Sequence, residues 1–175
     1  MARLYIRQDL LASNSRTIIK DQDNHAVFLL VGRWGSRGDV LSLYKMDGEI
    51  VASIKQATFS FTPGARFDLY QGFDKVGSLH RILSFNRDFY YVRRLGWVVS
   101  GQISQQEYRI MQLNRTIMTM SREILPNGNF YVLDIVDDAD APLAICIAAV
   151  LNYWLQNRQP TREQLKKYIP NFNLE

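Results

Sequence analysis

Apolar and polar residues alternate along most of the chain before residue 136, in short runs that are separated by turn-forming residues. Within residues 49–55, for example, Ile50, Ala52 and Ile54 point to one side and the residues between them point to the other. A period of two is typical of a β-strand. The same pattern predicts about twelve strands, near residues 3–8, 16–20, 26–32, 39–45, 49–56, 66–71, 75–83, 88–93, 95–103, 107–113, 116–123 and 129–135.

A hairpin unit recurs along the chain at a spacing of about 25 residues. Residues 17–27 align without a gap with residues 41–51, and residues 67–76 form a looser third copy. Asp23-Asn24 and Asp47-Gly48 occupy the turns, where such residues favour tight hairpins. Many short strands joined by tight turns predict an antiparallel meander, which forms either a sandwich or a closed barrel.

The pattern changes at residues 137–142, where three aspartates and a proline precede an apolar run. Early acids and a proline are typical of a helix start. Residues 141–151 contain no polar side chain on any face, and a helix of this kind must be surrounded by protein or lipid. Because the run is shorter than the roughly 20 residues that cross a bilayer, we predict a core helix inside a barrel.

A second, short helix is predicted near the end of the chain. Residues 161–164 read Thr-Arg-Glu-Gln, a capping box, and Leu165, Tyr168 and Ile169 form an apolar stripe after it. We therefore expect residues 1–158 to form one barrel with a central helix, and residues 159–175 to be a short helical extension of the same domain.

Length and composition fit one globular domain. The chain has 175 residues, of which 47% are hydrophobic and 22% are charged. Its single cysteine, Cys146, excludes an intramolecular disulfide, and residues 1–10 lack the apolar run of a signal peptide. These features predict a cytoplasmic protein.

The hairpin repeats, the acidic segment and the apolar helix together resemble the LURP-one-related family, which shares the Tubby C-terminal-like fold. The resemblance covers roughly residues 4–155 and includes the segments 4–8, 50–55 and 140–144. It implies a twelve-stranded barrel around a central helix, related to Tubby domains, which bind phosphoinositide headgroups, and to phospholipid scramblases. It brings no catalytic signature. The Lys and Arg pair of Tubby domains has no residue-by-residue match here, so the resemblance supplies no binding residue.

Positive charge is uneven along the chain. The whole chain has 21 Lys and Arg against 17 Asp and Glu, a net charge of +4. Residues 76–122 alone contain seven arginines, no lysine and two acids. Such a region could face phosphate groups, or it could form the ordinary solvated faces of several strands. The seven arginines of residues 76–122 are Arg81, Arg87, Arg93, Arg94, Arg109, Arg115 and Arg122.

The loop at residues 32–38 is the most suggestive local segment. Its glycines allow close backbone approach, while Arg33, Arg37 and the indole of Trp34 could hold a phosphate or a headgroup. It lacks the ending of a P-loop and joins two predicted strands. The alternative is a plain connection, since meanders require glycine-rich turns.

Catalytic and metal sites are not indicated. Cys146 lies in the apolar helix, where burial keeps a thiol protonated. His25 and His80 lack a metal-binding spacing, and helix-start electrostatics accounts for the acids of residues 137–140. The aromatic and basic residues of segment 89–97 could stack on single-stranded nucleic acid, but aromatics of a meander fill its core and the net charge is modest.

We therefore predict a non-enzymatic binding module without cofactor, catalytic residue or metal. Its partner would be anionic phospholipid at a membrane surface or another phosphorylated ligand, bound through Arg33, Trp34, Arg37, Arg93 and Arg94. Nucleic acid is not expected, and no oligomeric state is predicted. The alternative is a protein-interaction or structural domain that uses residues 161–169 and exposed strand surface. A third hypothesis, an enzyme that uses His25 or His80 beside a carboxylate, has no motif.

Overall fold

The computed structural model describes residues 1–8, 16–32, 39–57, 66–83 and 88–158. These ranges contain twelve strands, two short 3-10 turns and one long helix, close to the predicted positions. They are β1 (Ala2–Arg7), β2 (Arg16–Asp21), β3 (Ala26–Gly32), β4 (Val40–Lys45), β5 (Ile50–Gln56), β6 (Arg66–Gln71), β7 (Asp74–Leu83), β8 (Asp88–Arg93), β9 (Trp97–Gln102), η1 (Ile103–Gln105), β10 (Glu107–Gln112), β11 (Arg115–Leu125), β12 (Gly128–Ile135), η2 (Asp138–Asp140) and α2 (Ala141–Arg158).

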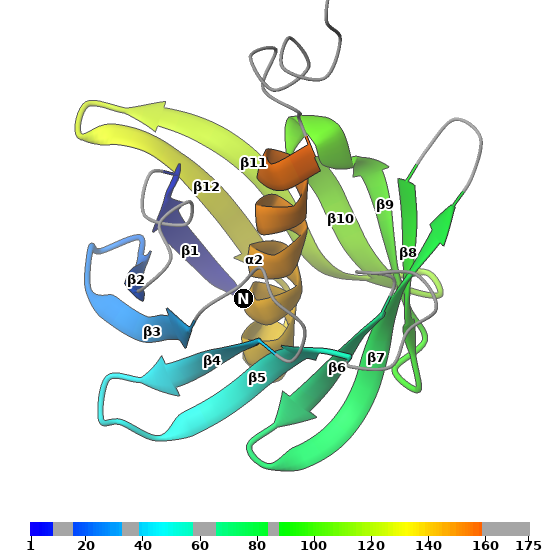
Figure 1. The fold of residues 1–175 in the computed structure, drawn as a ribbon. Helices are drawn as coiled ribbons and strands as arrows, with labels where there is room; N and C mark the ends of the chain where they lie inside the picture. The colour runs from blue at the N-terminus through cyan, green and yellow to red at the C-terminus, as the bar shows by residue number, and fades with distance from the viewer. Residues whose placement is uncertain (9–15, 33–38, 58–65, 84–87, 159–175) are drawn as a thin grey trace, which may run out of the picture.

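The strands form a closed antiparallel barrel around α2 (Figure 1). Each strand pairs with the next one along the chain, and β1 pairs with β12 from Ala2 opposite Ile135 to Arg7 opposite Phe130. This last pairing closes the sheet, so the predicted barrel is confirmed and a sandwich is excluded. Closure removes the open edges through which sheets aggregate or add strands.

The two ends of the barrel differ. Because neighbouring strands are antiparallel, the β2–β3, β4–β5, β6–β7, β8–β9 and β10–β11 turns all lie at one end, together with the link from β12 to α2. We call this the turn end. The turn between β11 and β12 lies at the opposite end of the barrel, and so does η1. The helix α2 runs from the turn end towards η1.

The barrel interior is apolar because alternate strand residues face α2. Leu41 and Leu43 of β4, for example, are buried, whereas Ser42 and Tyr44 between them are partly exposed. All residues from Leu143 to Leu151 of α2 are buried, and the helix packs mainly against β5, with further contacts to β4, β6, β11 and β12. The predicted position of the apolar helix is therefore confirmed.

Small side chains allow α2 to lie close to the strands. Ala144, Ala148 and Ala149 are buried with almost no exposure. Polar side chains enter the interior near the end of the barrel that lies opposite the turn end. There the Gln106 amide donates a 2.5 Å hydrogen bond to Asn152 Oδ1. Among the described residues, Asn152 Nδ2 and the Tyr108 hydroxyl are buried without a hydrogen-bond partner.

The aspartates before α2 lie just outside its first turn. Asp137 Oδ1 accepts a hydrogen bond from the backbone N–H of Ala139, which caps η2. Arg115 reaches the carboxylates of Asp137, at 3.3 Å, and Asp140, at 2.8 Å. The acids therefore form the connection into the helix, and they also pair with one arginine of the basic stretch.

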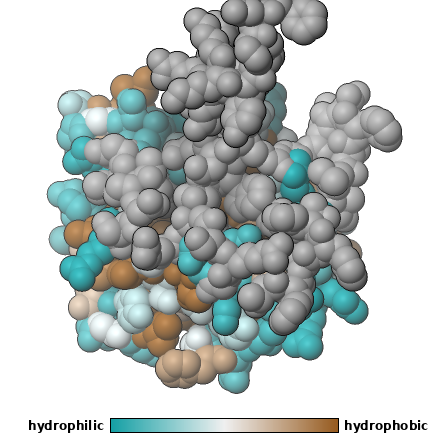
Figure 2. Space-filling view, in the orientation of Figure 1, coloured by the Kyte–Doolittle hydropathy of each residue, from teal (hydrophilic) through white to brown (hydrophobic). Residues whose placement is uncertain are grey.

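Several predictions concern segments outside the described ranges: the short helix at residues 161–169, the extension 159–175 and the loop 33–38. Within the described ranges, no helix combines the length and the apolar character that crossing a bilayer requires. Among the coloured residues visible in Figure 2, many are hydrophilic, but hydrophobic residues gather over the region where Figure 1 shows β3, β4 and β5.

Replacing Ala148 by leucine tests how tightly the barrel encloses the helix. The added isopropyl group has no space beside a fully buried alanine, so we expect the free energy of unfolding to fall by about 1–3 kcal/mol. Urea denaturation measures the loss. Ala26→Leu at the exposed start of β3 is the matched control and should change stability by less than about 0.5 kcal/mol. Equal stability of both variants would mean that the interior is loosely packed.

Candidate anion-binding surface

Cationic side chains gather on the outer wall of β6, β7 and β8. Strand pairing places Arg66 opposite His80, and His80 opposite Tyr91. Residues directly opposite one another in an antiparallel sheet share a face. Lys75 follows the β6–β7 turn, and two further cations lie at the end of β8. We call the five basic residues of this surface the basic wall: Arg66, Lys75, His80, Arg93 and Arg94.

A single carboxylate, Asp68, serves two cations of the basic wall. Its Oδ1 lies 3.1 Å from Arg66 Nη2, and its Oδ2 lies 2.8 Å from Lys75 Nζ. Arg93, opposite Ser78 on the neighbouring strand, is exposed and has no ion pair within the described part of the chain. The wall therefore keeps an excess of positive charge.

Arg94 connects two hairpins at the turn end. It adopts φ of 75°, a left-handed conformation that is unfavourable for residues with a side chain. Its Nη1 donates a 3.3 Å hydrogen bond to the backbone carbonyl of Lys75. This contact holds the β8–β9 turn against the start of β7, so the cations of both hairpins lie on one corner of the barrel.

His80 lies within the same charge cluster. Its Nε2 is 2.8 Å from the Ser78 hydroxyl. Partial burial lowers the pKa of His80, and the positive charges of Arg66, Arg93 and Lys75 lower it further, although Asp68 acts in the opposite direction. His80 is therefore neutral at pH 7, and the arginines and the lysine provide the charge of the wall.

The Ser78–His80 pair has the atom types of a nucleophile and a base. In a catalytic triad, however, a carboxylate orients the second ring nitrogen of the histidine. No carboxylate of the described segments forms that hydrogen bond with His80, and Asp68 is held by Arg66 and Lys75. Ser78 itself is only 6% exposed. The pair fits a structural hydrogen bond on the outside of a strand.

The structure describes only some of the predicted site residues. Arg93 and Arg94 are exposed and lie together on the basic wall. Arg33, Trp34 and Arg37 lie outside the described residues. Gly32, at the start of their loop, has φ of 153°, and a Cβ there would lie 2.2 Å from the Val40 carbonyl oxygen. This glycine is therefore required by strand geometry.

Other arginines of the basic stretch serve the barrel itself. Arg115 pairs with the acids before α2, and Arg122 donates a hydrogen bond to the backbone carbonyl of Gln105. These two arginines therefore have partners within the fold. The aromatic residues nearby also divide, because Tyr90 and Trp97 are buried in the core whereas Tyr91 is exposed.

Sequence reasoning did not place Arg66, Lys75 or His80 at an anion-binding surface, although it considered His80 for catalysis. Arg66 precedes the predicted basic stretch, and only the β6–β7 register brings it beside His80. The alternation within β6 was the available signal, because it places Arg66 and Asp68 on the outer face. Without the register, nothing in the sequence connects them to Arg93.

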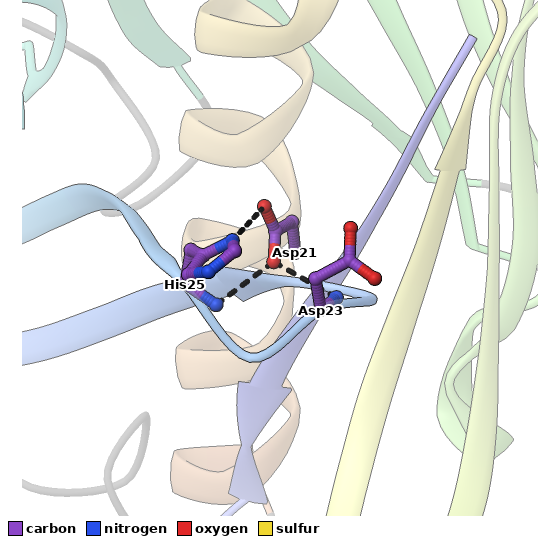
Figure 3. Close-up of side chains that lie close together, drawn as sticks. All are labelled: Asp21, Asp23 and His25. Atoms are coloured by element: carbon purple, nitrogen blue, oxygen red, sulfur yellow. Dashed lines mark hydrogen bonds and ion pairs between the residues drawn. The ribbon is translucent and has the colours of Figure 1, made fainter.

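Asp21, Asp23 and His25 form a second cluster, on the β2–β3 turn (Figure 3), with ligand atoms within 4.8 Å of one another. Asp21 Oδ1 accepts hydrogen bonds from the backbone N–H groups of Asp23, at 3.0 Å, and His25, at 2.8 Å. These contacts stabilise the hairpin turn. Strands β4 to β6 separate His25 from His80 around the barrel, so the two histidines do not share a site.

Cys146 is buried inside the barrel. Burial raises the pKa of its thiol to about 12, so the thiol remains protonated at neutral pH. Because the thiolate is the nucleophile of cysteine chemistry, this residue is a core side chain, as predicted.

Comparison with known proteins gives consistent results. A sequence profile described as LURP-one-related matches residues 2–152. An uncharacterized protein of Bacillus subtilis strain 168, YxjI, is 26% identical over 157 residues, which covers 90% of this chain and 96% of that protein. An X-ray structure of an Arabidopsis thaliana protein has a TM-score of 0.58 at 14% identity and covers 90% of this chain and 91% of its own. The latter similarity shows a shared fold.

The lowered pKa of His80 predicts a pH dependence of stability. Because the folded protein binds the proton less readily than the unfolded chain, stability is full above pH of about 6.5 and falls as pH drops through the folded pKa. We expect wild type to lose stability relative to His80→Asn between neutral and acidic pH. Urea denaturation at several pH values measures this difference. A difference in stability between wild type and His80→Asn that stays constant across the pH range would contradict this prediction.

The buried thiol predicts slow labelling of the folded protein. A chromogenic disulfide reagent at mildly alkaline pH should detect almost no thiol in the native chain and one thiol per chain after unfolding in guanidinium. Rapid reaction under native conditions would show that α2 leaves the barrel readily.

Proposed function

The chain belongs to the LURP-one-related family, and on that premise we propose that it is a non-enzymatic module whose basic wall docks on anionic phospholipid headgroups or another phosphorylated ligand. Family membership and fold fit a binding or interaction domain and suggest a domain without catalysis. The observation that carries the finer proposal is the basic wall, where Arg66 and Lys75 share one carboxylate and Arg93 has none within the described ranges.

The chemistry of these side chains suits phosphate. Arginine presents a planar fork of N–H donors that matches phosphate oxygens, and lysine adds a compact positive charge. A cation near an anionic bilayer contributes about 1 kcal/mol to attraction. Several cations on one wall of the barrel would therefore give reversible, salt-sensitive binding without a deep pocket.

Charge on the rest of the barrel supports one orientation. Asp21, Glu123 and Asp134 lie on β2, β11 and β12, which are on the other side of the barrel from β7. Arg3 pairs with Glu123 and Asp134, and Arg115 pairs with Asp137, so that side has little excess of positive charge whereas the basic wall keeps its own. An uneven charge distribution of this kind turns a protein toward an anionic surface. On this proposal the protein is cytoplasmic and peripheral at the membrane surface.

A protein-interaction role is the second candidate. The outer wall of β2, β3 and β4 carries an apolar row in which Ile18 lies opposite Leu29, and Leu29 opposite Tyr44. Ile18 is 44% exposed. A groove of about 420 Å³ follows this row, lined by Arg16, Leu29, Val31, Tyr44, Lys45, Met46 and Gly48. Exposed apolar surface of this kind is typical of protein contacts.

Co-sedimentation with vesicles tests the main proposal. We expect binding to anionic vesicles at low salt, no binding to neutral vesicles, and weaker binding at about 0.15 M salt, where the screening length is about 8 Å. Arg93→Ala/Arg94→Ala should lower the affinity by about 30-fold, since two cations are removed from the docking surface.

The matched control removes two charges from the opposite side of the barrel. Arg16→Ala/Lys20→Ala changes the net charge equally on β2, so its affinity should stay within about threefold of wild type. An Arg33→Ala/Arg37→Ala variant measures the contribution of the loop predicted from sequence. Deletion of residues 159–175 should leave vesicle binding intact. Absence of binding to anionic vesicles at low salt would contradict docking through the basic wall on a membrane. An equal loss of affinity in Arg93→Ala/Arg94→Ala and in Arg16→Ala/Lys20→Ala would contradict it too.

A further inference from the structure

The β6–β7 turn carries an aromatic side chain that the fold does not explain. Phe73 is 88% exposed and follows Gly72, whose φ of 56° forms the tight turn. The last strand pair before the turn is Gln71 with Asp74, so Phe73 lies at the hairpin tip. Turns of this length favour polar residues and glycine. Neither packing nor turn geometry therefore requires a phenylalanine here.

Phe73 lies at the corner of the barrel where the basic wall meets the turn end. Lys75 follows it by two residues, and the 3.3 Å hydrogen bond from Arg94 Nη1 to the Lys75 carbonyl brings the β8–β9 turn alongside. Arg93 precedes that turn on β8. Asp74 and Lys75 therefore directly follow the exposed aromatic tip, and Arg93 and Arg94 lie on the adjacent hairpin.

We propose that Phe73 inserts into the interfacial region of an anionic bilayer while Lys75, Arg93 and Arg94 contact the headgroups. This inference rests on the proposed function and commits it to a lipid surface. A soluble phosphorylated ligand has no apolar part that could bury the phenyl ring, whereas a bilayer places acyl chains directly beneath anionic groups. An aromatic side chain beside cations has the chemistry of that boundary.

Exposure of an apolar residue does not by itself indicate a membrane contact. Ile124 is 87% exposed, but it lies on β11 near the opposite end of the barrel and follows Glu123. It provides a control of nearly equal exposure that lies away from the basic wall and from the turn end. The proposal therefore depends on the combination of Phe73 with its charged neighbours.

The single buried cysteine allows a direct test. Because Cys146 is the only cysteine of the chain and is buried, Phe73→Cys and Ile124→Cys each introduce one accessible thiol. Each variant is labelled with an environment-sensitive fluorophore and mixed with vesicles of phosphatidylcholine alone or with phosphatidylserine. We expect a blue shift and quenching by acyl-chain quenchers at position 73 with the anionic vesicles, and no change at position 124.

A second measurement avoids any effect of the label. Phe73→Ser should weaken binding to anionic vesicles by about tenfold or more, the change expected from no longer burying an aromatic side chain. Ile124→Ser should bind as wild type does. Both side chains are exposed, so both variants should keep wild-type unfolding midpoints. Binding of inorganic pyrophosphate, measured by calorimetry, should not change in Phe73→Ser.

The outcomes separate this inference from the proposed function. If wild type binds anionic vesicles through Arg93 and Arg94 while the label at position 73 stays in water, or Phe73→Ser binds normally, insertion is wrong and headgroup docking stands. If only pyrophosphate binds, and binding requires Arg93, the ligand is soluble and insertion is again wrong. If neither vesicles nor pyrophosphate bind, the proposed function fails and the inference fails with it.

Discussion

Burial of a helix that has no polar face is the constraint on which the structure depends. The backbone hydrogen bonds of α2 are satisfied within the helix, so it can be surrounded by apolar side chains without leaving polar groups unpaired. A twelve-stranded barrel is wider than its own side chains fill, and α2 occupies that space. Its alanines allow the strands to approach closely, while β1 and β12 close the wall around it. Neither the helix nor the barrel would have a complete core without the other.

This packing determines where chemistry is available. The interior holds Cys146 and Tyr108 in surroundings that keep both protonated, because burial raises the pKa of each group. Within the described ranges, charged groups are therefore confined to the outer wall, the turns and the helix entry. A closed wall of regular strands presents side chains at fixed spacing on a shallow surface. Such a surface suits contact with an extended charged partner better than enclosure of a small neutral molecule.

The sequence predicted the positions of the strands and the helix better than it predicted which residues lie next to one another in space. Strands and helix depend on local periodicity, so Ile50 to Ile54 and residues 141–151 were assigned correctly. Alternation alone left sandwich and barrel open, since closure depends on the pairing of β1 with β12, the two ends of the meander. The same limit applies to the basic wall: Arg93 and Arg94 were found as a local pair, but Arg66 joins them only through strand register. Phe73 was not predicted as a surface contact because phenylalanine side chains are usually buried.

The two candidate surfaces use different parts of one barrel. The basic wall lies on β6 to β8, and the apolar groove lies on β2 to β4, with β5 between them. Arg115 does not extend the basic wall toward α2, because Asp137 and Asp140 pair with it at the helix entry. Docking through the corner at Phe73 would leave the end of the barrel near η1 uncovered, whereas the groove reaches the turn end itself through Met46 and Gly48 of the β4–β5 turn. A bilayer bound at that corner would therefore determine how much of the groove a second partner could reach.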